Sequence, residues 1–390
     1  MLFNSEPYLF FLPIVVLVNW VLPRRFRPFW LLLASYYFYS FWSAPFLLLV
    51  VGLTVINFVI GTRQARLLPR SRSLLVAALV VNIGALAIFK YLGLLDQSAD
   101  ALATLLGLSW GAPAVHIILP LGLSFFTFEF LHYQVDLFRG GVAIHNPINF
   151  ALFPAFFPTQ IAGPIKRYQD FNAQVEKHPR FDPVLCFEGV QLIARGLFKK
   201  VVLADTMAPI VAIVFGNPAA ATGLDGWTAL LAFYLQLYLD FSGYTDIGRG
   251  SAQLLGYRIP INFNAPYLAT SIQEFWRRWH MSLSFWLRDY LYIPLGGSRR
   301  SPGRVRLNLM ITMALGGLWH GAAWHFLMWG VGYGGALNIE RWWRARMAGR
   351  LKLSPALVIG GGWIATQLTW LVLLLVFRAS GLDVAAILGW

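Results

Sequence analysis

Long apolar runs, separated by short clusters of basic residues, recur from one end of the chain to the other. A helix of roughly 20 apolar residues crosses the ~30 Å hydrocarbon core of a bilayer. The pattern therefore predicts an all-α polytopic membrane protein, with about ten or eleven transmembrane or re-entrant helices. We expect these to form one integral membrane domain that covers residues 1–390.

The first half contains clear spans and one broken segment. Arg24, Arg25 and Arg27 follow the first span, so the positive-inside rule places the N-terminus outside and these arginines in the cytoplasm. Pro147–Pro164 is interrupted by Pro and Gly, which is typical of a re-entrant or interfacial segment. Asp96 and Asp100 are expected in an outer loop. The predicted spans are Tyr8–Leu22, Phe29–Trp42, Pro45–Ile60, Leu74–Ile88 and Val115–Leu137.

The second half divides less clearly because charged residues interrupt its apolar runs. Asp240–Asp246 holds two carboxylates and three hydroxyls, and we expect it at the end of an apolar helix. The basic loop Arg299–Arg306 is expected in the cytoplasm. The apolar stretches are Leu185–Phe215, Trp227–Leu239, Leu307–Ile339 and Pro355–Phe377.

Composition strengthens the membrane assignment and narrows the classes of partner. The mean hydropathy is +0.60, and 12% of the residues are charged. The net charge of +14 comes from basic residues dispersed between apolar runs, which favours topology and membrane lipids over nucleic acid. Cys186 is the one cysteine, which excludes an intramolecular disulfide and a cysteine-based metal site.

Two histidines are the first candidates for chemistry. His280 ends the polar and aromatic segment Gln273–His280, and His320 lies in the apolar stretch Leu315–Ala322. An ionisable residue at membrane depth costs roughly 2.5 kcal/mol or more, so it tends to persist where it has a task. A neutral imidazole can accept a proton from a hydroxyl nucleophile. The alternative is that each is a buried histidine that a neighbour satisfies.

Two further polar groups compete for a functional role. Asp240–Asp246, together with Asn262 and Asn264, could bind a cation or a hydroxylated substrate, or could form an intramembrane turn. Its spacing matches no calcium-loop pattern, and no metal site is predicted. Several arginines could hold the phosphates of a nucleotide-bearing donor, or could anchor the topology: Arg277, Arg278, Arg288, Arg299, Arg300, Arg304 and Arg306.

Several long motifs, which follow one another in a fixed order, resemble the membrane-bound O-acyltransferase family and its alginate and exopolysaccharide O-acetylation branch. In the second half these are Asp240-Phe-Ser-Gly-Tyr-Thr-Asp246, Asn262-Phe-Asn-Ala-Pro-Tyr267, the run from Glu274-Phe-Trp-Arg-Arg-Trp-His280 to Gly297, and Gly316-Gly-Leu-Trp-His-Gly-Ala322. Phe157-Pro-Thr-Gln-Ile-Ala-Gly-Pro-Ile-Lys166 and Gly196-Leu-Phe-Lys-Lys-Val-Val-Leu-Ala-Asp205 support the same branch.

The resemblance implies an acyltransferase with two catalytic histidines. The essential histidine of the family's Trp-His-Gly motif falls on His320, and the second polar position, about 40 residues upstream, falls on His280. It also implies a ring of tilted helices around a thinned central funnel. His320 would act as general base, and His280 would orient or polarise the carbonyl of the acyl donor.

The resemblance further implies a donor, an acceptor and a location. No cofactor is expected to stay bound; acetyl-CoA, or another acyl thioester, would be the donor substrate. The acceptor would be an exported polysaccharide such as alginate or a periplasmic acetyltransferase partner protein, reached across the bacterial inner membrane. Residues expected to bind substrate or donor are Trp276, Arg277, Arg278, Arg288, Trp319, Asp240, Tyr244 and Asn264.

Alternatives to this interpretation stay open from the sequence. Longer members of the branch continue beyond the position of Trp390, so the chain is expected to be a short or truncated member. A relative that moves D-alanine or a lipid acyl group would share the same histidines. A transporter or channel for a small polar substrate would also use broken helices and buried charges, but the chain shows no inverted repeat.

Overall fold

Helices account for all the regular structure in the described part of the chain. The computed structural model describes residues 1–108, 117–347 and 354–378, and within these ranges it contains helices and no β-strand. Three helical stretches there are long and apolar enough to cross a membrane, namely Ala44–Arg66, Arg72–Leu105 and Pro355–Arg378. The predicted all-α membrane fold is confirmed, whereas the expectation of ten or eleven segments stays a prediction.

The described residues divide into two compact units. Unit 1 comprises residues from Met1 to Leu197 together with Tyr244–Pro260, and unit 2 comprises Phe198–Gly243 together with residues from Ile261 onward. The chain passes between the units three times, and one of these passages lies within the long helix α11 (Gly223–Leu254). Both predicted catalytic histidines belong to unit 2.

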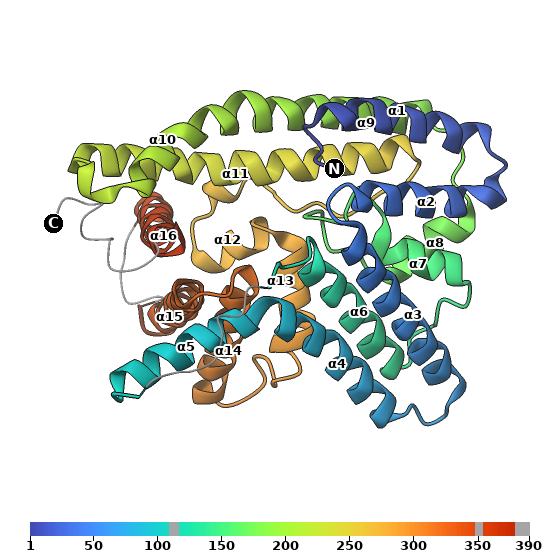
Figure 1. Cartoon of the computed structure of the whole chain (residues 1–390). Helices are drawn as coiled ribbons and strands as arrows, with labels where there is room; N and C mark the ends of the chain where they lie inside the picture. Colours follow the sequence, from blue (N-terminus) through green and yellow to red (C-terminus); the bar gives the residue numbers. More distant parts are fainter. Residues whose placement is uncertain (109–116, 348–353, 379–390) are drawn as a thin grey trace. The chain divides into compact units, whose positions relative to one another are not determined.

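Unit 1 is a set of helices joined in part by buried amide side chains. α3, α4 and α6 lie side by side (Figure 1). Asn57 and Asn82 exchange hydrogen bonds of 3.0 and 2.9 Å, and the Gln134 amide donates to the Asn57 carbonyl at 2.8 Å. Such bonds satisfy polar groups where no water is present. The helices are α1 (Glu6–Val21), α2 (Arg27–Ser40), α3 (Ala44–Arg66), α4 (Arg72–Leu86), α5 (Leu92–Leu105), α6 (Leu123–Phe138), α7 (Pro147–Ala155), α8 (Tyr168–Lys177) and α9 (Pro183–Leu197).

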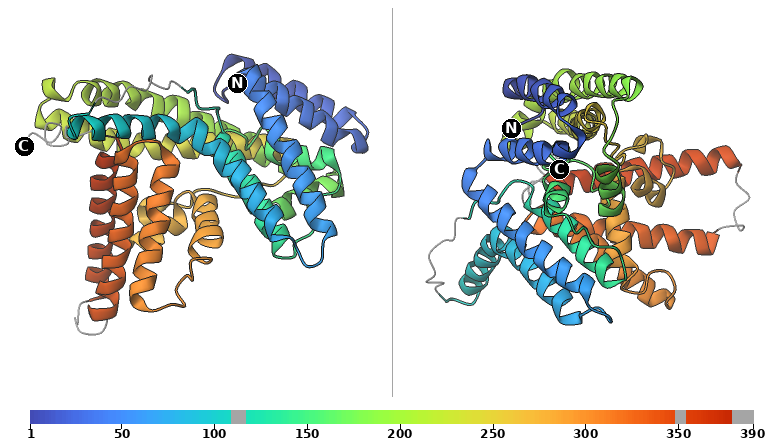
Figure 2. Two further views of the ribbon diagram at one scale, coloured as in Figure 1. Left: turned by 60° about the horizontal axis from the view of Figure 1, so that its bottom comes forward. Right: turned by 90° about the vertical axis from the view of Figure 1, so that its right-hand side faces the viewer.

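Unit 2 carries the two motifs that contain the histidines. Its last three helices pack in chain order, α14 against α15 and α15 against α16, and run side by side (Figure 2). An aromatic cluster that includes Phe275, Trp279, Trp329, Tyr333 and Trp370 fills its core. Besides its part of α11, the helices are α10 (Asp205–Gly216), α12 (Ile272–Arg278), α13 (Met281–Leu287), α14 (Pro302–His320), α15 (Trp324–Met347) and α16 (Pro355–Arg378).

Glycines let the backbones of α14 and α15 come into direct contact. A Cβ at Gly317 would lie 2.2 Å from the Phe326 carbonyl oxygen, and one at Gly330 would lie 2.3 Å from the Met313 carbonyl oxygen. Any larger residue would clash with backbone, which cannot move aside as a side chain can. Small residues permit this close approach of helices. The contact holds α14, which ends in His320, against α15.

The structure corrects four of the predicted boundaries. Asp240–Asp246 lies inside the continuous helix α11, so neither a helix end nor a turn exists there. Leu307–Ile339 is not one span, because α14 ends at His320 and α15 begins at Trp324. Asp96 and Asp100 lie in α5, not in a loop, since α4 continues into α5 through the π-helical turn η2 (Ala87–Tyr91).

The fourth correction concerns the basic loop. Arg304 and Arg306 lie in the first turns of α14, which begins at Pro302, so the loop ends at Ser301. Proline at the start of a helix has no intrahelical N–H bond to lose, which explains this early start. The predicted span Val115–Leu137 corresponds to α6, which begins only at Leu123; Val115 itself lies outside the described residues.

Replacement of Gly330 by alanine should separate α14 from α15. Overpacking of this kind costs about 1–3 kcal/mol, so Gly330→Ala should lower the unfolding temperature in detergent and reduce activity. Gly335→Ala in the same helix is the matched control, because a Cβ there meets nothing within 4 Å. It should stabilise the helix by about 0.5–1 kcal/mol. Equal unfolding temperatures for the two variants would contradict the close contact.

Candidate active site

A break between two short helices positions His280. α12 ends at Arg278 and α13 begins at Met281, and His280 between them has φ 40° and ψ 54°. A non-glycine residue in this left-handed region is strained, and such strain gathers at functional sites. The side chain is 1% exposed, and neither ring nitrogen has a hydrogen-bond partner among the described residues.

Asn262 holds the chain on the far side of this break. Its carbonyl oxygen accepts from the Met281 N–H at 2.9 Å, and its side-chain oxygen accepts from the Ser282 hydroxyl at 2.6 Å. The start of α13 is therefore tied to the segment before α12. The Phe241 ring packs edge to face against the His280 imidazole, with the ring centroids 4.8 Å apart.

His320 is the last residue of α14 and lies among aromatic rings. Gly321 after it is extended, which ends the helix. The ring centroids of Trp319, Trp329 and Phe377 lie 5.0, 5.0 and 5.5 Å from the His320 ring. Trp319 also lies 5.9 Å from His280. One tryptophan thus contacts both predicted catalytic histidines, although 40 residues separate them in sequence.

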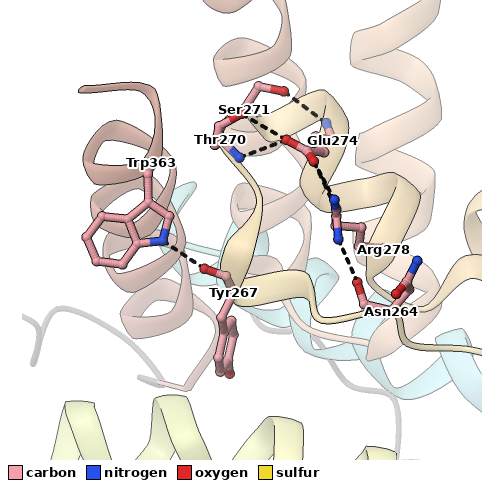
Figure 3. A network of polar contacts seen from close by, with 7 residues as sticks. All are labelled: Asn264, Tyr267, Thr270, Ser271, Glu274, Arg278 and Trp363. Atoms are coloured by element: carbon pink, nitrogen blue, oxygen red, sulfur yellow. Dashed lines mark hydrogen bonds and ion pairs between the residues drawn. The ribbon is translucent and has the colours of Figure 1, made fainter. Parts of the chain in front are cut away.

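A polar network at the start of α12 supports the His280 segment (Figure 3). Ser271 caps the helix by accepting from the Glu274 N–H at 3.1 Å, and Glu274 in turn accepts from the Thr270 N–H and hydroxyl at 2.9 Å each. Arg278 binds Glu274 at 2.8 Å and donates to the Asn264 carbonyl at 3.2 Å. This arrangement resembles a capping box, in which a side chain of the first turn reaches back to the preceding backbone.

The same network gives Arg278 and Asn264 structural contacts. The Asn264 N–H donates to the Arg278 carbonyl at 2.9 Å, so the two residues join the segment before α12 to the end of that helix. A second tie in Figure 3 is the Trp363 indole N–H, which donates to the Tyr267 carbonyl at 2.8 Å and links α16 to the same segment. His280 is therefore supported from several directions.

Four other predicted substrate-binding residues do not take part in the Glu274 network. Arg277 is exposed and forms no ion pair with the described residues. Arg288 pairs with Asp289 at 2.7 Å. Asp240 pairs with Lys200 at 2.7 Å. Tyr244 belongs to unit 1, where its ring stacks on Phe3 with centroids 4.4 Å apart. Arg288, Asp240 and Tyr244 thus each have a different partner within their own unit.

Two residues of the site escaped the sequence reasoning. Trp329 and Tyr333 lie one turn apart on α15, and both contact Trp276, which was predicted. Trp329 also contacts His320. The available signal was their spacing of four residues beside Gly330 and Gly334, which marks one face of a closely packed helix. Among the described residues no group of three His, Cys, Asp or Glu side chains could hold a metal ion.

Comparison with known proteins identifies similar chains. The model of the MBOAT, or membrane-bound O-acyltransferase, family matches residues 31–377, across both units. The chain is 42% identical to the probable alginate O-acetylase AlgI of Azotobacter vinelandii over 99% of this chain and 76% of that protein. It is equally identical to the Pseudomonas aeruginosa protein of the same name, over 99% and 73%. Identity to the peptidoglycan O-acetyltransferase of Helicobacter pylori is 36%, over 87% and 70%.

The Glu274 network predicts a specific pH dependence of stability. Hydrogen bonds from Thr270, followed by those from Arg278, hold the pKa of the Glu274 carboxyl below its usual value. A lowered folded-state pKa contributes stability above the unfolded pKa of about 4.3, and this contribution is lost as the pH falls through the folded pKa. The parent should therefore unfold at a higher temperature than Glu274→Gln near neutral pH, and the difference should shrink below about pH 4.3.

Thermal unfolding in detergent across this pH range measures the effect. Arg277→Gln is the matched control. Arg277 is next to Arg278 in sequence, but its own guanidinium is exposed and forms no ion pair within the described ranges. It should leave the unfolding temperature and its pH profile unchanged. A difference between the parent and Glu274→Gln that stayed constant with pH would show that the carboxylate charge does not support this segment.

Proposed function

The chain belongs to the membrane-bound O-acyltransferase family, and it is an O-acyltransferase. From this premise we propose that it takes an acetyl group from a cytoplasmic thioester, acetyl-CoA, and delivers it across the bacterial inner membrane for O-acetylation of an exported polysaccharide. The observation that carries the proposal is the position of Trp319, whose ring lies against both His280 and His320.

His320 acts as the general base in this proposal. Its imidazole accepts the proton of an acceptor hydroxyl, while the hydroxyl oxygen forms a bond to the thioester carbonyl carbon. When the carbonyl re-forms, the carbon–sulfur bond breaks, and the CoA thiolate takes the proton back from His320. The products are an acetyl ester and free CoA, so atoms and charge balance. His320 is half-buried at the end of α14, which supports this role because the side chain is not fully enclosed by the protein.

His280 orients the acyl donor beside His320. Its ring is buried, and within the described residues neither nitrogen has a protein partner, so both nitrogens are available to a substrate group. A buried polar group without a partner costs about 1–3 kcal/mol. A ligand that supplies the missing hydrogen bond recovers this cost on binding. The strained backbone at φ 40° fits the same proposal, since it turns the ring out of the helix path.

Exposed arginines near α12 and before α14 are proposed to hold the phosphates of the donor. Arg277 is the preferred candidate, because it is exposed and its neighbour Arg278 is engaged by Glu274. Arg299 and Arg300 lie in the exposed turn before α14 and add positive charge on the same unit. Guanidinium groups bind phosphates through paired hydrogen bonds. The positive-inside rule favours the cytoplasm for Arg299 and Arg300, which is consistent with a cytoplasmic donor.

The acceptor is proposed from the relatives. Two of them are named probable alginate O-acetylases and one a peptidoglycan O-acetyltransferase, so the acceptors in their names are polysaccharides. An exported polysaccharide, reached directly or through a periplasmic acetyltransferase partner, is therefore the proposed acceptor. The proposed topology has the N-terminus outside, because the positive-inside rule favours the cytoplasm for Arg24, Arg25 and Arg27 after α1.

Removal of the base should abolish transfer. In reconstituted vesicles that contain radiolabelled acetyl-CoA and a polysaccharide acceptor, His320→Ala should lower the rate by roughly 10²–10⁴-fold. His280→Asn, which tolerates the left-handed backbone, should raise KM for the donor more than it lowers kcat. His145→Ala is the control, since His145 is exposed in unit 1. Parental activity in a folded His320→Ala variant would refute the assignment.

A further inference from the structure

Three aromatic side chains form a triangle next to His320. Trp276 from α12 and Trp329 and Tyr333 from α15 have ring centroids 5.9, 5.0 and 5.0 Å apart, and every pair meets edge to face. The Trp329 ring also lies 5.0 Å from His320. Each ring of the triangle carries one hydrogen-bond donor, an indole N–H or a phenol O–H.

None of these three donors has an acceptor among the described residues. The indole nitrogens of Trp276 and Trp329 and the hydroxyl of Tyr333 are all enclosed without a hydrogen-bond partner. Trp329 is 3% exposed and Tyr333 is 1% exposed, so bulk water does not reach them. Buried Trp and Tyr side chains usually find a partner. Three such donors without one, carried by rings that contact one another, therefore indicate a ligand that supplies an acceptor.

The chemistry of the triangle restricts that ligand. Both indole groups can only donate, so the ligand atom must accept hydrogen bonds. The triangle contains no cation, and a buried full anion without a counter-charge is costly, which disfavours phosphate and carboxylate. A neutral oxygen that gains negative charge during the reaction fits best. The carbonyl oxygen of a thioester has this property, because it becomes an oxyanion when a nucleophile attacks.

We infer that Trp276, Trp329 and Tyr333 form the subsite that receives the acyl carbonyl oxygen of the donor. This inference rests on the proposed acetyl transfer at His320 and names residues that stabilise its intermediate. When the acceptor oxygen bonds to the carbonyl carbon, the carbonyl electron pair moves to the oxygen, which these donors stabilise. When the carbonyl forms again, the carbon–sulfur bond breaks and the oxyanion charge leaves the subsite.

Tyr333→Phe tests the subsite with a minimal change, since it removes one oxygen. The matched control is Tyr234→Phe, because the Tyr234 hydroxyl donates to the Gln367 side chain at 2.6 Å. The control should lower the unfolding temperature in detergent, whereas Tyr333→Phe should maintain or raise it. A decrease in Tyr333→Phe as large as in the control would show that the hydroxyl has an internal partner, and would overturn the inference.

Binding of two CoA analogues tests the ligand independently of turnover. One analogue replaces the thioester sulfur of acetyl-CoA by a methylene, which keeps the carbonyl and prevents transfer. The other is the ethyl thioether of CoA, which has a similar length and lacks the carbonyl oxygen. The parent should prefer the carbonyl analogue, and Tyr333→Phe should reduce that preference by about tenfold, or 1.4 kcal/mol. Acetyl transfer by Tyr333→Phe should fall mainly in kcat.

The outcomes separate this inference from the proposed function. If the parent prefers the carbonyl analogue and Tyr333→Phe retains the full preference, the subsite is wrong while acetyl transfer from CoA stands. If the parent binds the two analogues equally, the carbonyl is not recognised, and the subsite is again wrong. If the parent binds neither analogue, the CoA thioester is not the donor, and both proposals fail.

Discussion

The direct contact between the backbones of α14 and α15 is the constraint on which the site depends. Gly317 and Gly330 leave no space for a side chain between these helices, so the end of one helix is held against the start of the next. His320 ends α14, and Trp329 and Tyr333 lie on the facing helix. Trp329, which lies against His320, is therefore positioned by main-chain contact. In an apolar chain this is a rigid way to hold a polar side chain, because backbone packing does not depend on flexible rotamers.

The composition of the site follows from the cost of charge in a membrane protein. Aromatic rings lie against His280 and His320, whereas charged groups of the same segment pair with one another, as Glu274 does with Arg278. Aromatic side chains combine an apolar face with a single polar donor. They can thus enclose a reacting carbonyl without adding a permanent charge that the surroundings would have to stabilise.

The sequence predicted the helices and the two histidines but not how the site is assembled. Apolar runs locate α1 to α4 within a few residues, because their composition alone requires burial or lipid. The same reasoning failed at Asp240–Asp246, since a continuous helix tolerates carboxylates when Lys200 pairs with one of them. It also missed the break after His320, where hydrophobicity continues but Gly321 allows the chain to leave the helix. Trp329 and Tyr333 could not be distinguished from core residues, because hydrogen-bond satisfaction is a property of the folded structure.

In the proposed mechanism, the acetyl group of the donor binds beside His320. Bromoacetyl-CoA tests it directly, because its carbon adjacent to the carbonyl loses bromide to a neighbouring imidazole nitrogen and forms a stable bond. Peptide mass spectrometry of the labelled protein should find the adduct on His320, and excess acetyl-CoA should prevent its formation. An adduct confined to histidines outside unit 2, or labelling of His320 that acetyl-CoA does not suppress, would contradict the account.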